Sequence, residues 1–246
     1  MHEFTLEKLE RGRRSSAGFS LIELLVVTGI IGVLTALVIP AVGILKGAGD
    51  VTKTVYDLNG AIELARVYAT RNNTYSWVGF FEEGAGGPAG TAGTGRLVVS
   101  VVGSRDGTRI YSEASPTALN PAILVQVGKL MRFENVHLDT PAAIAVPRAV
   151  VPNADYQVAS DAFNMRDGSA NAVTFPYPIT GSPQYTFTKV IQFNPQGDAT
   201  RVLDTPARLI ELGLRPTRGS TIDTSSANLA VLQITGIGGQ SKIYRP

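Results

Sequence analysis

An uncharged apolar run near the N-terminus restricts this chain more than any other feature of the sequence. Residues 24–45 are 22 consecutive amino acids without a charged side chain. A helix rises about 1.5 Å per residue, so roughly 20 apolar residues cross the hydrocarbon of a bilayer. Four basic side chains lie between residues 8 and 14, and Asp50 is the first acid after the run. The positive-inside rule therefore predicts a cytoplasmic N-terminus and export of everything after the run.

Three ordinary explanations of this run remain open. A secretory signal peptide has a shorter apolar core, of about 7–15 residues, although the small residues of IPAVGILKGAG (39–49) offer a cleavage site. A plain signal anchor explains the length but not the carboxylate of Glu23 near its start. A buried helix of a cytosolic protein would not explain the basic residues that precede the run.

The segment GFSLIELLVV (18–27) resembles the N-terminal signature of type IV pilins and type II secretion pseudopilins. That signature is a basic leader ending in glycine, then an aromatic residue, then a glutamate four residues later in an apolar helix. The resemblance implies that a prepilin peptidase cleaves between Gly18 and Phe19 and methylates the new amino group of Phe19. It also implies that Glu23 acts in assembly. The leader, residues 1–18, is somewhat long for the family, and Ser15-Ser16-Ala17 separate its arginines from the glycine.

The physical chemistry of Glu23 fits such a role. A carboxylate inside the bilayer costs several kcal/mol. The cationic amine of Phe19 from an incoming subunit would neutralise it, and only one axial offset between neighbouring helices makes that pair. The alternative is that Glu23 lies in the headgroup layer near the helix end, at modest cost.

We predict one long, bent helix over residues 19–73. Residues 19–45 would form a transmembrane segment and the filament core. Pro40 lacks an N–H group and clashes with the preceding turn, so we expect a helix kink near it. Residues 46–73 would be amphipathic and pack on a sheet. Their apolar positions recur at three- and four-residue steps, namely Val51, Val55, Leu58, Ile62, Ala65 and Ala69.

From residue 74 onward the pattern changes to strands, rich in β-branched and aromatic residues and separated by turn formers. The segments are 74–82, 96–104, 108–114, 122–130, 185–194 and 229–237. GAGGPAGTAGTG (84–95) should be a mobile loop and not a phosphate cradle, because no Lys-Ser/Thr pair and no helix follows it. RLIELGLR (208–215) is expected as a short helical turn. The fold class is α+β, type IV pilin-like, with an antiparallel β head over 74–246.

Three further segments resemble the minor pseudopilin H and FimT-like group. They are AIELARVYATRNN (61–73), VIQFNPQGDATRVLD (190–204) and LAVLQITGIGGQSKIYRP (229–246). In that group a helix end, a Phe-x-Pro-x-Gly turn and a closing pair of strands occupy these places. The first match is short and only moderately specific.

The head offers no case for an active site. The chain has no cysteine and only two histidines, His2 and His137, so thiolate chemistry is excluded and a multi-histidine metal site is not expected. DGSAN (167–171) and NPQGD (194–198) are too short to be more than calcium candidates. We therefore expect no enzyme activity, no cofactor and no metal, and leave the calcium question open.

These observations predict a minor pilin or pseudopilin subunit that assembles into a type II secretion pseudopilus or a type IV pilus. Its partners would be the prepilin peptidase, other pilin subunits and the inner membrane, with the head in the periplasm. The alternative is a DNA- or surface-binding minor tip pilin. The segment from Arg201 to the end of the sequence contains six basic and three acidic residues. The basic residues are spread out and few aromatic residues lie between them, so nucleic acid is not expected as a partner.

Overall fold

The computed structural model describes residues 20–108, 111–112, 115–140, 144, 147, 156–158, 173–202, 205–206 and 208–246. For residues 37–49, 111–112, 115–117, 156–158, 201–202 and 205 only the backbone is described. The chain divides into two compact units, Met1–Ile44 and Leu45–Pro246. Each unit is described here by itself.

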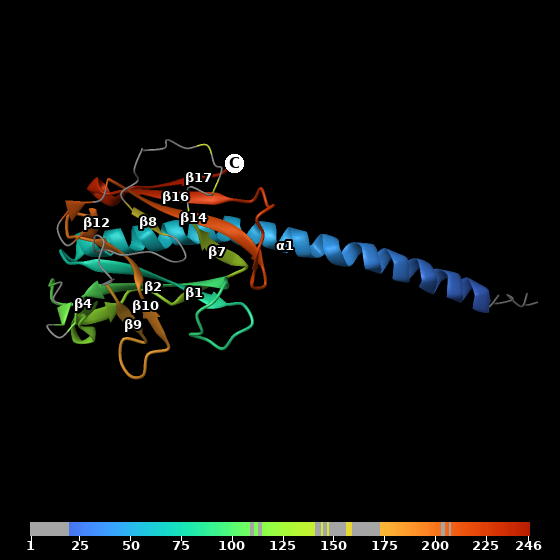
Figure 1. The fold of residues 1–246 in the computed structure, drawn as a ribbon, viewed down its shortest axis with the longest axis horizontal. Coiled ribbons are helices and arrows are strands. Elements are labelled where there is room, and N and C mark those ends of the chain that lie inside the picture. Colours follow the sequence, from blue (N-terminus) through green and yellow to red (C-terminus); the bar gives the residue numbers. More distant parts are fainter. Residues whose placement is uncertain are drawn as a thin grey trace, which may run out of the picture. The chain divides into compact units, whose positions relative to one another are not determined.

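The first unit contains the start of helix α1, which spans Leu21–Arg71 (Figure 1). The backbone of residues 37–49 is helical, so the helix does not end at Pro40, and the kink there stays a prediction. Among the residues that the structure describes, no helix is both long enough and apolar enough to cross a membrane.

The second unit is a β head packed on one side of α1. All six positions of the expected apolar stripe, from Val51 to Ala69, are fully buried and belong to one hydrophobic core with both large sheets. The predicted amphipathic face is therefore confirmed. Ser76 in the first strand donates a hydrogen bond to the carbonyl of Ala65 at 2.7 Å, which joins the helix to the sheet.

The first sheet has seven strands in the order β13-β12-β11-β1-β2-β5, with β6 also paired to β2. All of these pairs are antiparallel. The strands are β1 (Ser76–Gly84), β2 (Gly95–Ser104), β5 (Leu124–Gln126), β6 (Met131–Glu134), β11 (Lys189–Phe193), β12 (Ala199–Val202) and β13 (Thr205–Pro206).

The second sheet has six strands in the order β15-β14-β16-β17, with β7 and β8 both paired to β14. Only the β8–β14 pair of this sheet is parallel. The strands are β7 (Val136–Asp139), β8 (Tyr156–Val158), β14 (Leu209–Arg218), β15 (Thr221–Ile222), β16 (Ala230–Thr235) and β17 (Ser241–Tyr244).

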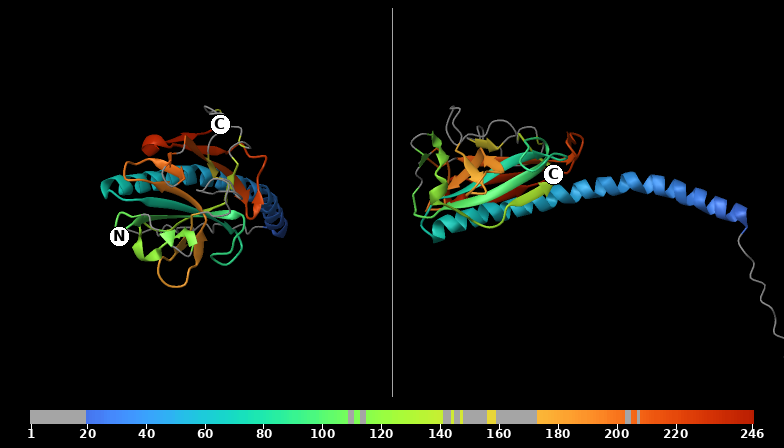
Figure 2. Two further views of the ribbon diagram at one scale, coloured as in Figure 1. Left: turned by 60° about the vertical axis from the view of Figure 1, so that its left-hand side comes forward. Right: turned by 90° about the horizontal axis from the view of Figure 1, so that it is seen from below.

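Smaller elements complete the head. Strand β9 (Phe175–Tyr177) pairs with β10 (Tyr185–Phe187), and β3 (Tyr111–Ser112) pairs with β4 (Ser115–Leu119). Short 3-10 turns lie at η1 (Pro121–Ile123) and η3 (Ile237–Gly239). A helix and mainly antiparallel sheets thus confirm the expected α+β class, and Figure 2 shows the same elements from two further directions.

The helical turn predicted at residues 208–215 is wrong, because this segment is the central strand β14. Both faces of β14 are covered, so its buried positions are nearly continuous and do not alternate. Even Glu211 is only 4% exposed, and it accepts a hydrogen bond from Gln233 at 2.5 Å. The period of two typical of a strand was present in the sequence, since Ile210, Leu212 and Leu214 alternate with Glu211, Gly213 and Arg215.

The glycine-rich segment 84–95 does form the loop between β1 and β2. Its backbone is hydrogen-bonded internally, and the amide of Gly93 reaches the carbonyl of Glu82 at 3.1 Å. The amide of Gly90 also donates to the side chain of Glu83 at 2.7 Å. The loop is therefore more constrained than its glycine content predicted.

A buried polar cluster around Glu82 joins the two sheets. Its Oε1 atom lies 2.6 Å from Nδ1 of His137 and accepts the amide of Leu138 at 3.0 Å. Its Oε2 atom accepts from Nζ of Lys189 at 3.0 Å. Because β1 and β11 belong to the first sheet and β7 to the second, this carboxylate links them.

We expect Glu82 to make the head less stable in acid. Burial alone would raise the pKa of Glu82, but the His137 hydrogen bond, the Lys189 charge and the Leu138 amide together lower it below its ordinary value of 4.5. A lowered folded pKa contributes stability above about pH 4.5 that is lost as the pH falls through the folded value. Glu82→Gln should cost about 2 kcal/mol at pH 7 and flatten the acid side of the stability profile.

Fluorescence of Trp77, the single tryptophan, measures this, because its side chain is fully buried in the head. Urea titrations between pH 3 and pH 7 would compare the two chains. An equally steep acid slope in the glutamine variant would contradict the assignment to Glu82.

Candidate functional site

The first turn of α1 is closed by two reciprocal hydrogen bonds. The amide of Ser20 donates to Oε2 of Glu23 at 2.8 Å, and the amide of Glu23 donates to Oγ of Ser20 at 3.3 Å. This is a capping box, in which a serine before the helix and a glutamate three residues later satisfy amides that have no partner within the helix. Sequence reasoning placed Glu23 but missed Ser20, although the Ser-x-x-Glu pattern was readable.

The cap leaves capacity for a second partner on the same carboxylate. Glu23 is exposed in the single chain, and among the described residues its side chain makes only the bond to Ser20. An ionised carboxylate offers about four acceptor positions. A cation brought by another molecule can therefore bind Glu23 without breaking the cap.

Beyond this turn the helix presents an apolar surface. Ten apolar side chains are more than half exposed, an unusual amount for one helix of a soluble monomer. They are Leu21, Ile22, Leu24, Leu25, Val26, Val27, Ile30, Ile31, Val33 and Leu34. This surface suits burial against apolar partners, whether lipid or other helices.

The remaining predicted site residues are only partly visible. Gly18 and Phe19 lie outside the described residues, so cleavage and methylation there stay predictions. Pro40 is described through its backbone alone.

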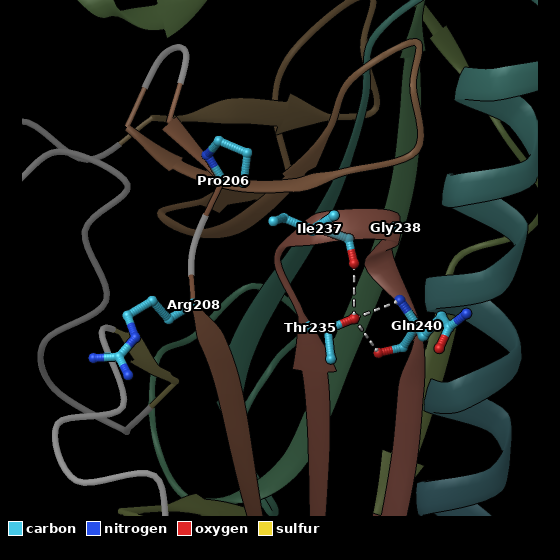
Figure 3. Close-up of a pocket in the computed structure, with 6 residues that line it drawn as sticks. All are labelled: Pro206, Arg208, Thr235, Ile237, Gly238 and Gln240. Carbon is cyan, nitrogen blue, oxygen red and sulfur yellow. Dashed lines mark hydrogen bonds between the residues drawn. The ribbon is translucent and has the colours of Figure 1, made fainter.

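A shallow hollow of about 770 Å³ lies beside η3 in the head (Figure 3). Its lining residues are Pro206, Arg208, Thr235, Ile237, Gly238 and Gln240. The hydroxyl of Thr235 is already used, since it bonds the carbonyl of Ile237 at 3.1 Å and accepts the amide of Gln240 at 3.1 Å. Among the described residues of this lining, Arg208 is the one ionisable side chain, so they provide no acid–base pair.

The calcium candidate at residues 194–198 is a structural turn. Asp198 Oδ1 accepts the amide of Gly238 at 2.8 Å, and Asn194 Oδ1 accepts the amide of Asp198 at 2.8 Å. Within the described part of the chain no group of three His, Cys, Asp or Glu side chains is placed to hold a metal ion. The other candidate, residues 167–171, lies outside that part.

Three of the C-terminal arginines, Arg215, Arg218 and Arg245, make contacts within the head. Arg215 is 7% exposed, and its Nε lies 2.6 Å from Oδ2 of Asp139. Arg218 pairs with Asp223 at 3.1 Å, and Arg245 donates to Oγ1 of Thr52 at 2.7 Å. These contacts give no support to the nucleic-acid alternative.

Comparison with known proteins identifies the N-terminal segment. Residues 13–39 match the family described as the prokaryotic N-terminal methylation motif, which confirms the predicted type IV pilin signal. The chain is 42% identical over 64 residues to the type IV wide pilus major component PilA4 of Thermus thermophilus. That match covers 26% of this chain and 48% of the relative, so the chain spans about half the length of the curated relative. No solved structure matches the chain significantly.

Proposed function

We propose that this chain, which carries the N-terminal signal of type IV pilins, is a minor pilin or pseudopilin subunit. A prepilin peptidase would remove residues 1–18 and methylate Phe19. The mature subunit would then pack by α1 into a filament of a type IV pilus or a type II secretion system. The observation that carries this proposal is the first turn of α1, where the exposed carboxylate of Glu23 heads an exposed apolar helix face.

The same helix would hold the subunit in the inner membrane before assembly. The basis is the 22-residue uncharged run behind a basic flank, which has the length and polarity of a membrane anchor. The head would then lie in the periplasm. Its partners would be the peptidase and other pilin-like subunits.

The head geometry supports membership of the H and FimT-like group, because the three segments that resemble this group meet. Gly197 has a φ of 85°, and a Cβ on Gly239 would lie 2.3 Å from the Gly197 carbonyl oxygen. The same Cβ would lie 3.0 Å from Cδ of Arg66 on α1. Both glycines are therefore required where the turn, the closing hairpin and the helix end touch.

Incubation with a prepilin peptidase tests the proposal. With S-adenosylmethionine supplied as methyl donor, the full chain in detergent should become shorter by the 18-residue leader, and N-terminal sequencing should begin at Phe19 with a methylated amine. A Gly18→Arg chain is the control and should stay uncut, because a bulky cation replaces the small residue before the bond. An unchanged N-terminus in the unmodified chain would refute the assignment.

A further inference from the structure

The charges of the head are divided unequally between its interior and its surface. The whole chain is close to neutral, with a formal net charge of +2 at pH 7. Among the head residues whose side chains the structure describes, however, eight exposed side chains are cationic and two are anionic. The cations are Lys53, Arg71, Arg105, Lys129, Arg132, Arg208, Arg218 and Lys242, and the anions are Asp106 and Glu134. The described surface of the head is therefore more cationic than the sequence as a whole.

The difference arises because several carboxylates of the head are used inside it. Glu83 and Glu211 are buried, and the side chains of Glu82 and Asp139 are only 9% and 21% exposed. Each of these four carboxylates binds a donor on a neighbouring strand. A carboxylate that leaves water needs such donors. These negative charges therefore stabilise the interior and do not balance the cations outside.

The exposed cations are spread around the head and do not gather on one face. Lys53 and Arg71 both belong to α1 and lie about 27 Å apart along it. Arg208 precedes β14 and Arg218 ends it, so about 30 Å of strand separates them. A membrane is a plane and would be met by cations on one face. Duplex DNA carries one charge per about 1.7 Å and is met by a closely spaced track of cations. The observed distribution fits neither partner.

Three of the exposed cations keep their charge available for a ligand. Within the described part of the chain, Arg71, Arg105 and Lys129 take part in no ion pair, whereas Lys53 pairs with Asp57 at 3.2 Å. They belong to three different places, namely the end of α1, the residue after β2 and the link between β5 and β6. A partner that uses all three must be extended, flexible and negatively charged at wide intervals.

We propose that the head binds an acidic polysaccharide. Such a polymer carries its charges on separate sugars, and it is flexible enough to pass the head on more than one side. Exposed ion pairs are individually weak and are screened by salt, so the binding depends on several of them together. The inference goes beyond the proposed function, which concerns α1. It rests on that function only for placing the head outside the membrane, among the polymers of the cell envelope.

Binding to polygalacturonate tests the inference, with the full chain in a neutral detergent and the polymer immobilised on a biosensor. We expect binding that weakens as the salt concentration rises. It should be absent from fully methyl-esterified polygalacturonate, which has the same backbone without the charges. Replacing Arg71, Arg105 and Lys129 together with glutamine should weaken the binding about tenfold. All three side chains are exposed, so the unfolding midpoint of the head should not change.

The matched control keeps all three charges, as Arg71→Lys, Arg105→Lys and Lys129→Arg, and should bind like the unmodified chain. Equal binding to the charged and the esterified polymer, or equal affinities of the glutamine variant and the unmodified chain, would overturn the inference. Binding to duplex DNA but not to polygalacturonate at the same salt concentration would overturn it in favour of a nucleic acid. Failure of peptidase cleavage would instead refute the proposed function, and it is measured separately from this binding.

Discussion

Replacing Glu23 with glutamine should stop the chain from entering filaments while its amount in the membrane stays unchanged. Glutamine at this position still completes the capping box with Ser20, so the helix start is preserved. Only the negative charge is lost, and with it the ion pair to the amine of a neighbouring Phe19. We expect at least a tenfold loss, measured as the ratio of filament-bound to membrane-bound chain.

Ser20→Ala is the matched control for this result. It removes the hydroxyl that accepts the Glu23 amide at 3.3 Å and costs about 1 kcal/mol of helix capping, but it keeps the carboxylate. That chain should assemble. Normal filament yield with Glu23→Gln would show that the negative charge is not needed for assembly. A loss with Ser20→Ala as large as that with Glu23→Gln would show that the cap itself is needed.

The capping box gives Glu23 a role within its own helix. From the sequence, the carboxylate of Glu23 either lies in the headgroup layer or pairs with the amine of another subunit. The structure gives Glu23 a partner in its own chain, the amide of Ser20 at 2.8 Å. In the proposed assembly the neighbouring amine would therefore be an additional partner for a carboxylate that already caps its own helix.

The buried face of α1 could be predicted from the sequence because its apolar residues repeat at a regular spacing. The positions from Val51 to Ala69 repeat at helical steps, and each of the six is fully buried. The prediction for segment 208–215 was wrong although Ile210, Leu212 and Leu214 alternate with Glu211, Gly213 and Arg215, which is the pattern of a strand. What the alternation does not predict is the burial of Glu211 and Arg215, which follows from the cover on both faces of β14.

The buried charges could not be predicted because their partners are distant in sequence. Glu82 meets His137 at a separation of 55 residues and Lys189 at 107. Its neighbour Glu83 meets Tyr185 at 102. Adjacent residues of a strand point to opposite faces of the sheet. Acids at both Glu82 and Glu83 therefore suggest, from the sequence, that both faces are exposed to solvent at this end of β1. Only the packing of the second sheet and the 84–95 loop buries both.

Glu83→Ala should therefore strongly destabilise the head. Its side chain is fully buried, and its Oε2 accepts from Arg96 at 2.9 Å. Its Oε1 accepts the amide of Gly90 at 2.7 Å and the hydroxyl of Tyr185 at 3.2 Å. Removing it leaves the Arg96 cation and the loop amide without this acceptor, which costs about 3–5 kcal/mol of unfolding free energy.

Glu134→Ala provides the comparison, because Glu134 binds the same guanidinium at 2.6 Å but is 54% exposed. An exposed ion pair contributes at most about 1 kcal/mol, so this variant should unfold close to the unmodified chain. Urea titration followed by the fluorescence of Trp77 measures both. Similar losses in the two variants would mean that charge balance at Arg96, and not the burial of Glu83, governs this corner of the head.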